Sequence, residues 1–186
     1  MGKLGGGFTK NLPKEQRAVG DFYPTPECAL DVLLTKVQFD GPIWECCAGG
    51  GAISKYLEAK GYAVESTEIR EGPDVYGRGG VDFLAEDQTR VNILTNPPFC
   101  LAEDFIRQGI RLTTGKCAFL LRLAFLESER RYKLFTEFPP AHVIVISRRL
   151  PFFHDGKWHA TGSTFPHAWL VWDKQDTKTK LSWGTF

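Results

Sequence analysis

The sequence lacks any long apolar segment. None of its apolar runs approaches the ~18 residues that a membrane-spanning helix requires. Its first eight residues, MGKLGGGF, also lack the apolar block of a secretory signal. We therefore expect a cytoplasmic protein that makes no contact with a membrane.

An excess of one charge is also missing. Lys and Arg total 23 and Asp and Glu total 22, which gives a formal net charge of +1. A chain so close to neutral has no long-range attraction for a polyanion. Any surface that binds nucleic acid must therefore be local.

Cysteines are few and are not arranged for metal binding. None of the 5 forms a CxxC pair, and none lies beside a histidine at the spacing of zinc ligands. We expect reduced thiols and no metal site. No Cys or Ser stands next to a recognisable base, so a covalent mechanism is not indicated either.

What the chain does contain is the composition of a packed protein. The 186 residues are 42% hydrophobic and 13% aromatic, which suits one domain with a real core and excludes two large domains. Residues 1–20 are rich in Gly and Lys without periodicity, and we expect a flexible basic arm. We expect residues 21–186 to form a single domain.

Apolar runs and helical patterns alternate along residues 21–186. Helices are predicted at 27–36, 52–60, 101–112 and 127–138, the first capped by Thr25. Strands are predicted at 43–47, 62–69, 81–84, 91–95, 116–123, 142–147 and 168–172. A polar, aromatic loop at 150–166, with no helix, joins the last two strands, so these should pair antiparallel. The pattern predicts an α/β fold with a seven-stranded, mostly parallel sheet, an antiparallel last strand and helices on both faces.

Polar residues stand at the ends of the first two predicted strands, where ligands of parallel sheets bind. Glu45 is followed by a turn containing Gly49 and Gly51, and glycines allow a ligand to approach the backbone closely. Ser54 replaces the third glycine of the GxGxxG pattern, so the loop alone is weak evidence. Glu68 follows Gly49 by 19 positions, close to the offset of ~20 at which a carboxylate binds the hydroxyls of a ribose.

The next two strand ends suggest a nucleoside and an amine. Asp82 could accept a hydrogen bond from an exocyclic amino group, and Phe83 could cover a purine face. At Asn96-Pro97-Pro98-Phe99, two prolines fix the backbone so that the Asn96 side-chain oxygen and the Pro97 carbonyl converge on one point. Both can accept from a planar amine while Phe99 stacks on its ring, which would direct the nitrogen toward an electrophile.

Together these motifs resemble the class I S-adenosylmethionine-dependent methyltransferases, and among them the small N6-adenine DNA methyltransferases of bacteriophages and prophages. The resemblance covers residues 21 to about 174. It implies a Rossmann-like methyltransferase fold and S-adenosyl-L-methionine as cofactor. It further implies a methyltransferase domain at 21–186 without the separate target-recognition domain that larger members of the family carry. It also implies host-cell cytoplasm as the location if the chain is phage-encoded. Two positions depart from the pattern, because Cys47 stands where the family often has Phe and Phe99 where many members have Tyr.

The resemblance also assigns roles to individual residues. The segment before the first helix would pack over the methionine part of the cofactor, and the glycine turn and the next two strand ends would hold the rest. The implied cofactor-binding residues are Phe22, Tyr23, Thr25, Glu45, Cys47, Gly49, Gly51, Glu68, Ile69, Asp82, Phe83 and Asn96. The implied catalytic residues are Asn96, Pro97, Pro98 and Phe99.

Cations interleaved with aromatic residues suggest where nucleic acid would bind. The candidates are Lys14, Arg17, Arg130, Arg148, Arg149 and Lys157. Arg122 lies inside an apolar strand, and we expect a buried ion pair to compensate its charge.

The sequence as a whole favours methyl transfer to the N6 amine of adenine in DNA, either a duplex with a flipped base or a single strand. The protein would be a monomer or a homodimer. The same chemistry on an RNA base or on a protein glutamine amide stays open. So does a non-catalytic subunit that only binds the cofactor.

Overall fold

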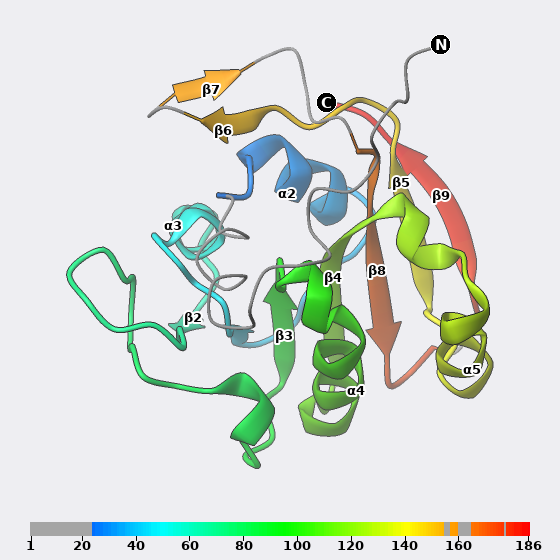
Figure 1. The fold of residues 1–186 in the computed structure, drawn as a ribbon, viewed down its shortest axis with the longest axis horizontal. Helices are drawn as coiled ribbons and strands as arrows, with labels where there is room; N and C mark the ends of the chain where they lie inside the picture. The colour runs from blue at the N-terminus through cyan, green and yellow to red at the C-terminus, as the bar shows by residue number, and fades with distance from the viewer. Residues whose placement is uncertain (1–23, 155–156, 160–164, 177) are drawn as a thin grey trace, which may run out of the picture.

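A computed structural model describes residues 24–154, 157–159, 165–176 and 178–186 (Figure 1). The helices are α2 (Glu27–Leu34), α3 (Ala52–Ala59), α4 (Ala102–Leu112) and α5 (Glu129–Glu137), with short 3-10 helices η1 (Phe83–Ala85), η2 (Phe99–Leu101) and η3 (Leu123–Leu126). The strands of the main sheet are β1 (Ile43–Glu45), β2 (Val64–Ser66), β3 (Asn92–Thr95), β4 (Lys116–Arg122), β5 (His142–Ile146), β8 (His167–Asp173) and β9 (Lys180–Gly184). A separate hairpin consists of β6 (Phe152–His154) and β7 (Lys157–His159). None of the helices in this described part is long and apolar enough to cross a membrane.

The main sheet has seven strands in the order β2-β1-β3-β4-β8-β5-β9. All of its neighbouring strands pair in parallel except β8, which runs antiparallel to both β4 and β5. The predicted α/β fold with a mostly parallel, seven-stranded sheet is confirmed. So is the antiparallel pairing of the strands that flank the loop at 150–166, which itself carries the β6–β7 hairpin.

Two strand assignments differ from the prediction. The strand expected at 81–84 is wrong, because the Asp82 side chain accepts a hydrogen bond from Leu84 N and starts the η1 turn. The segment that pairs with the end of β2 lies earlier in the chain, at Arg78. Arg78 N donates to Ser66 O, and Glu68 N donates to Arg78 O. The seventh strand is β9, which was not predicted since its sequence, KLSWG, has no sustained apolar pattern.

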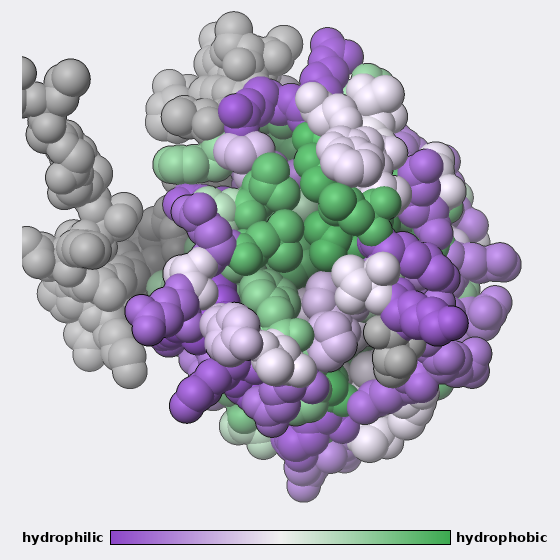
Figure 2. Space-filling model, turned by 90° about the vertical axis from the view of Figure 1, so that its right-hand side faces the viewer, coloured by the Kyte–Doolittle hydropathy of each residue, from purple (hydrophilic) through white to green (hydrophobic). Residues whose placement is uncertain are grey.

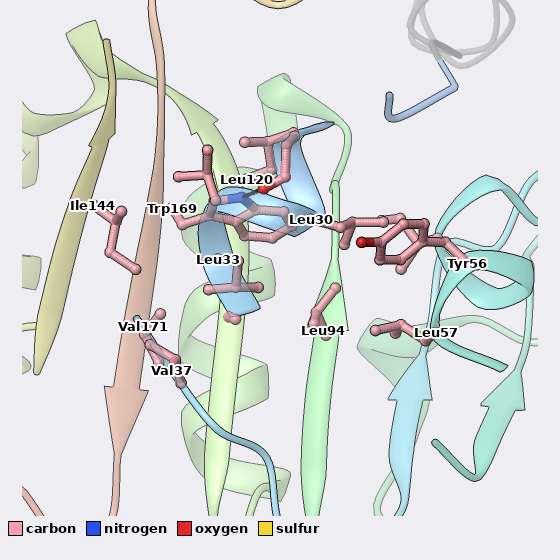
Figure 3. Packing of buried hydrophobic residues seen from close by; sticks show 14 of the residues in the cluster. Leu30, Leu33, Val37, Tyr56, Leu57, Leu94, Leu120, Ile144, Trp169 and Val171 are labelled. Atoms are coloured by element: carbon pink, nitrogen blue, oxygen red, sulfur yellow. Dashed lines mark hydrogen bonds between the residues drawn. The ribbon is translucent and has the colours of Figure 1, made fainter. Parts of the chain in front are cut away.

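Helices cover both faces of the sheet, as predicted (Figure 1). On one face, side chains of α2 and α3 pack with Leu94, Leu120 and Trp169 (Figure 3). The Trp169 indole N–H donates to Ala29 O over 2.7 Å, which ties β8 to α2. On the other face, α4 and α5 bury a second cluster against the alternate residues of the same strands.

The outer edge of the sheet carries exposed apolar side chains. Figure 2 shows apolar residues gathered on the side of the molecule where β9 and α5 lie. Leu181 and Trp183 on β9 are 57% and 58% exposed. This apolar surface lies at the β9 edge of the sheet, separate from the strand ends that carry the predicted motifs.

Close packing of α4 on β4 depends on a glycine. A Cβ atom at Gly109 would lie 2.5 Å from Cζ of the Phe119 ring. Gly109→Ala should therefore lower the free energy of unfolding by about 1–3 kcal/mol through overpacking, although alanine in a helix interior normally stabilises by ~1 kcal/mol. Urea denaturation measures the change, and the double variant Gly109→Ala/Phe119→Leu should lose less than the sum of the single losses. A single variant as stable as the parent would contradict this packing.

Candidate active site

A buried carboxyl group joins the ends of two neighbouring strands. Glu45 ends β1 and is 0% exposed, and its Oε1 accepts hydrogen bonds from Thr95 Oγ1 at the end of β3 and from Cys47 N. The distances are 2.5 Å and 3.0 Å. Its other oxygen, Oε2, is buried and has no hydrogen-bond partner among the described residues. In its ionised form Glu45 therefore offers one free acceptor inside the site.

Burial governs the protonation of this carboxyl. Desolvation raises the pKa of Glu45 to about 8, and the charge of Glu68 adds to the rise. The hydrogen bonds from Thr95 and Cys47 favour the ionised form but do not outweigh burial. Glu45 is therefore mostly protonated at neutral pH as long as no cation lies beside it.

The glycine turn is held to the end of β2. Gly49 N donates to Glu68 Oε2 over 2.9 Å, so the two residues separated by 19 positions are in direct contact. The second carboxylate oxygen of Glu68 accepts from Arg70 N and Arg70 Nε. The structure thus brings together the glycine turn and the acidic strand end that the sequence singled out.

The ring of Tyr76 leaves no room for a side chain at Gly51. This glycine begins α3 with φ of 84°, and a Cβ atom there would lie 2.4 Å from Cγ of the Tyr76 ring. Tyr76 N donates to Gly49 O over 2.8 Å, and the Tyr76 hydroxyl donates to Glu58 Oε2 over 2.6 Å. Tyr76 therefore rests against the glycine turn, a contact that nothing in the local sequence indicated.

The residues predicted for the nucleoside part of a ligand divide between surface and core. Ile69, directly after Glu68, is 60% exposed. Asp82 is exposed, and the backbone bond from Val81 N to Glu68 O, 3.0 Å long, keeps it beside the same strand end. Phe83 is 2% exposed and packs between Trp44 and Phe105. The expectation that Phe83 covers a purine is corrected, because its ring belongs to the core.

The catalytic motif begins with an oriented carboxamide. Asn96 Nδ2 donates to Thr25 Oγ1 over 3.1 Å, while Asn96 Oδ1 is buried and has no partner among the described residues. Thr25 is 5% exposed and does not cap α2, whose N-cap is Pro26 without a side-chain hydrogen bond. The predicted capping role is wrong, since the threonine hydroxyl is used by Asn96. The cofactor candidates Phe22 and Tyr23 lie outside the described residues.

The rest of the motif carries an aromatic and cationic cluster. Pro97 is buried and Pro98 and Phe99 are half-buried. Arg122, the last residue of β4, places its Cζ 4.4 Å from the centre of the Phe99 ring and 4.1 Å from that of Phe165. Among the described residues, contacts with these two rings take the place of the buried ion pair that was expected for Arg122.

The candidate nucleic-acid residues are spread around the molecule. Arg148 and Arg149 are exposed and follow β5. The carboxyl end of β5 lies on the same side of the sheet as the carboxyl ends of β1, β3 and β4. Arg130 is exposed on α5, and its Nε lies 3.5 Å from Glu103 Oε2. Lys14 and Arg17 lie outside the described residues, and Lys157 lies in β7 with its side chain outside the described part.

The fold matches those of solved methyltransferases. A protein from Pyrococcus horikoshii described as an RNA methyltransferase superposes with a TM-score of 0.61 at 14% identity, covering 89% of this chain and 90% of that one. A protein from Vibrio vulnificus YJ016 described as the modification subunit of a type I restriction enzyme gives 0.58 at 14% identity, covering 92% of this chain and 49% of that one. A predicted O-methyltransferase from Agrobacterium tumefaciens gives 0.54 at 16% identity, covering 83% and 84%.

These similarities establish a Rossmann-like methyltransferase fold, as predicted. The chain spans about half the length of the modification subunit. No protein-family model matches the sequence, and no curated protein matches it significantly.

The buried carboxyl predicts a pH-dependent stability. The folded protein keeps the Glu45 proton up to a pKa of about 8, whereas the unfolded chain releases it near 4.5. Between these values the folded state binds more protons, so this group makes the free energy of unfolding fall as pH rises, by at most ~1.4 kcal/mol per pH unit. Glu45→Gln cannot ionise and should lose less stability between about pH 6 and about pH 8.

Urea denaturation of both proteins across that pH range checks the difference. Other titrating groups, such as the half-buried His167, are common to both proteins and cancel in the comparison. Stability curves that run parallel would show that Glu45 is already ionised in the folded protein.

Proposed function

We propose that the protein transfers the methyl group of S-adenosyl-L-methionine to the N6 amine of adenine in DNA. The observation that carries this proposal is the Asn96 carboxamide, whose oxygen is buried without a partner among the described residues while its nitrogen is held by Thr25. A buried acceptor with no donor costs free energy, and such groups persist where a ligand supplies the donor. A planar amine supplies N–H groups of the required kind.

The residues at the other strand ends fit the proposed cofactor. Glu45 Oε2, which has no partner among the described residues, would accept from the ammonium group of the cofactor, and the approach of that cation would favour the ionised form of the carboxyl. Glu68, already fixed by Gly49, would accept from ribose hydroxyls, and the exposed Ile69 would contact the adenine ring. When bound, S-adenosyl-L-methionine supplies a methyl group on a sulfonium, which an amine nitrogen can take to leave S-adenosylhomocysteine.

The chain's own groups would position the acceptor amine. Asn96 Oδ1 accepts one N–H and holds the nitrogen lone pair toward the methyl group, while Phe99 stacks on the base. Pro97 and Pro98, which lie between Asn96 and Phe99, restrict the backbone and so keep the carboxamide and the ring in fixed relative positions. No strong base is required, because the extra proton can leave for solvent once the nitrogen has become cationic.

DNA is proposed on the strength of the motif pattern, in which the segment containing Thr25 precedes the glycine turn. RNA is the second candidate, and it is favoured by the similarity of fold along 89% of the chain to a protein described as an RNA methyltransferase. Incubation of labelled cofactor with duplex DNA, single-stranded DNA, RNA and protein separates these acceptors. Label that enters only a protein would contradict the proposed function.

Asn96→Ala should abolish transfer without abolishing cofactor binding. Removing one group that positions the reacting atoms costs about 100-fold or more in rate, whereas the cofactor keeps Glu45 and Glu68. Transfer of labelled methyl to DNA and calorimetric titration with S-adenosylhomocysteine measure the two quantities. Gln88→Ala, which changes an exposed amide away from the motif, is the control. An Asn96→Ala protein with the parent's transfer rate would refute the role of the carboxamide.

Thr25→Val should separate orientation of Asn96 from binding of the cofactor. Valine keeps the shape of threonine but removes the hydroxyl that accepts from Asn96 Nδ2. We expect kcat to fall by about 10-fold, corresponding to the ~1.4 kcal/mol scale of one hydrogen bond, with little change in cofactor affinity. Thr25→Ser should stay near the parent. If cofactor affinity falls and kcat does not, Thr25 acts on the cofactor instead.

A further inference from the structure

A cationic cluster lies directly beside the predicted base-stacking residue. The Arg122 guanidinium lies over the Phe99 ring and over the Phe165 ring, at 4.4 Å and 4.1 Å from their centres. Its Nε is buried and lacks a hydrogen-bond partner in the described part of the chain. Among the described residues, Arg122 is therefore held by ring faces while its buried Nε has no acceptor.

No negative charge compensates this guanidinium within the described residues. The neighbour of Arg122 across the β4–β8 ladder is His167, and their strands pair residue for residue. Burial first, and then the charges of Arg122 and Arg149, lower the pKa of His167 to about 4, so His167 is neutral at physiological pH. The histidine ring centre lies 6.3 Å from that of Phe99. The surroundings of Phe99 are thus positive, with Arg122 closest and Arg149 near enough to act on the same histidine.

We propose that Arg122 binds a backbone phosphate of the strand whose target base stacks on Phe99, with Arg149 adding to the positive field. The inference rests on the proposed function and specifies its acceptor as a nucleic-acid strand. A phosphate supplies both the negative charge and the acceptor oxygens that Arg122 lacks among the described residues, whereas a protein glutamine amide brings no charge to this half-buried cation. Arg122 covers one face of the Phe99 ring, and the base would stack on the other.

Salt dependence of binding tests the phosphate contact. Each phosphate neutralised by a protein cation contributes about one unit to the slope of log affinity against log salt concentration. Arg122→Gln should lower the affinity for a fluorescein-labelled single-stranded DNA by about 10-fold and reduce this slope by about one unit. Arg122→Lys keeps the charge and should keep the slope. Arg111→Gln, in the last turn of α4 where the guanidinium donates to Glu86 O, should change neither.

Titration with S-adenosylhomocysteine verifies that each variant is folded. Arg122→Met preserves the apolar stem and replaces Arg122→Gln if the latter unfolds. An unchanged salt slope in a folded, neutral variant would overturn the inference and leave Arg122 as a support for the Phe99 ring. Parallel measurements with an RNA of the same sequence show which nucleic acid supplies the phosphate.

The binding and transfer measurements distinguish the two proposals. If the parent methylates nucleic acid but the neutral variant keeps its slope, the phosphate contact fails and the proposed function stands. If the slope falls while the parent transfers no methyl group to any nucleic acid, the binding site stands and the proposed reaction fails.

Discussion

The hydrogen bond between Thr95 and the buried Glu45 carboxyl is the contact on which the site depends, because it fixes the ends of β1 and β3 against each other. Two further side-chain bonds extend the connection. Glu68 accepts from Gly49 on one side, and Thr25 accepts from Asn96 on the other. Residues that lie up to 71 positions apart in the chain are thereby placed together at the carboxyl ends of the strands. Backbone pairing aligns the strands, and these side-chain bonds hold the polar groups of the site in position.

The two halves of the site differ in electrostatic character. On the side of the glycine turn, a protonated Glu45 with a free oxygen is prepared for a cation, which would complete its ionisation. On the side of Phe99, Arg122 is a cation without a counter-ion among the described residues. A cationic cofactor would pair with the carboxyl group of Glu45, and an anionic nucleic-acid strand would pair with the guanidinium group of Arg122. Methyl transfer between oppositely charged partners suits such an arrangement.

Sequence reasoning succeeded where the signal was local and failed where it was tertiary. The end of β1 with Glu45, the acidic end of β2 and the Asn96 motif were all recognisable because apolar strands end abruptly in polar residues. Asp82 and Phe83 also follow this pattern, but a side-chain hydrogen bond turns the backbone and sends the ring into the core.

Other features had no local signal at all. The strand β9 lies at the edge of the sheet and none of its residues is fully buried, so burial never imposed an apolar pattern on it. The setting of Arg122 depends on rings contributed by η2 and by the segment before β8, which only the folded chain brings together. Likewise, Gly51 cannot be replaced without displacing the ring of Tyr76, whatever ligand the turn receives. A relative that no longer bound a cofactor but kept this tyrosine would still require the glycine. A glycine motif typical of nucleotide binding can therefore be retained after the binding has been lost.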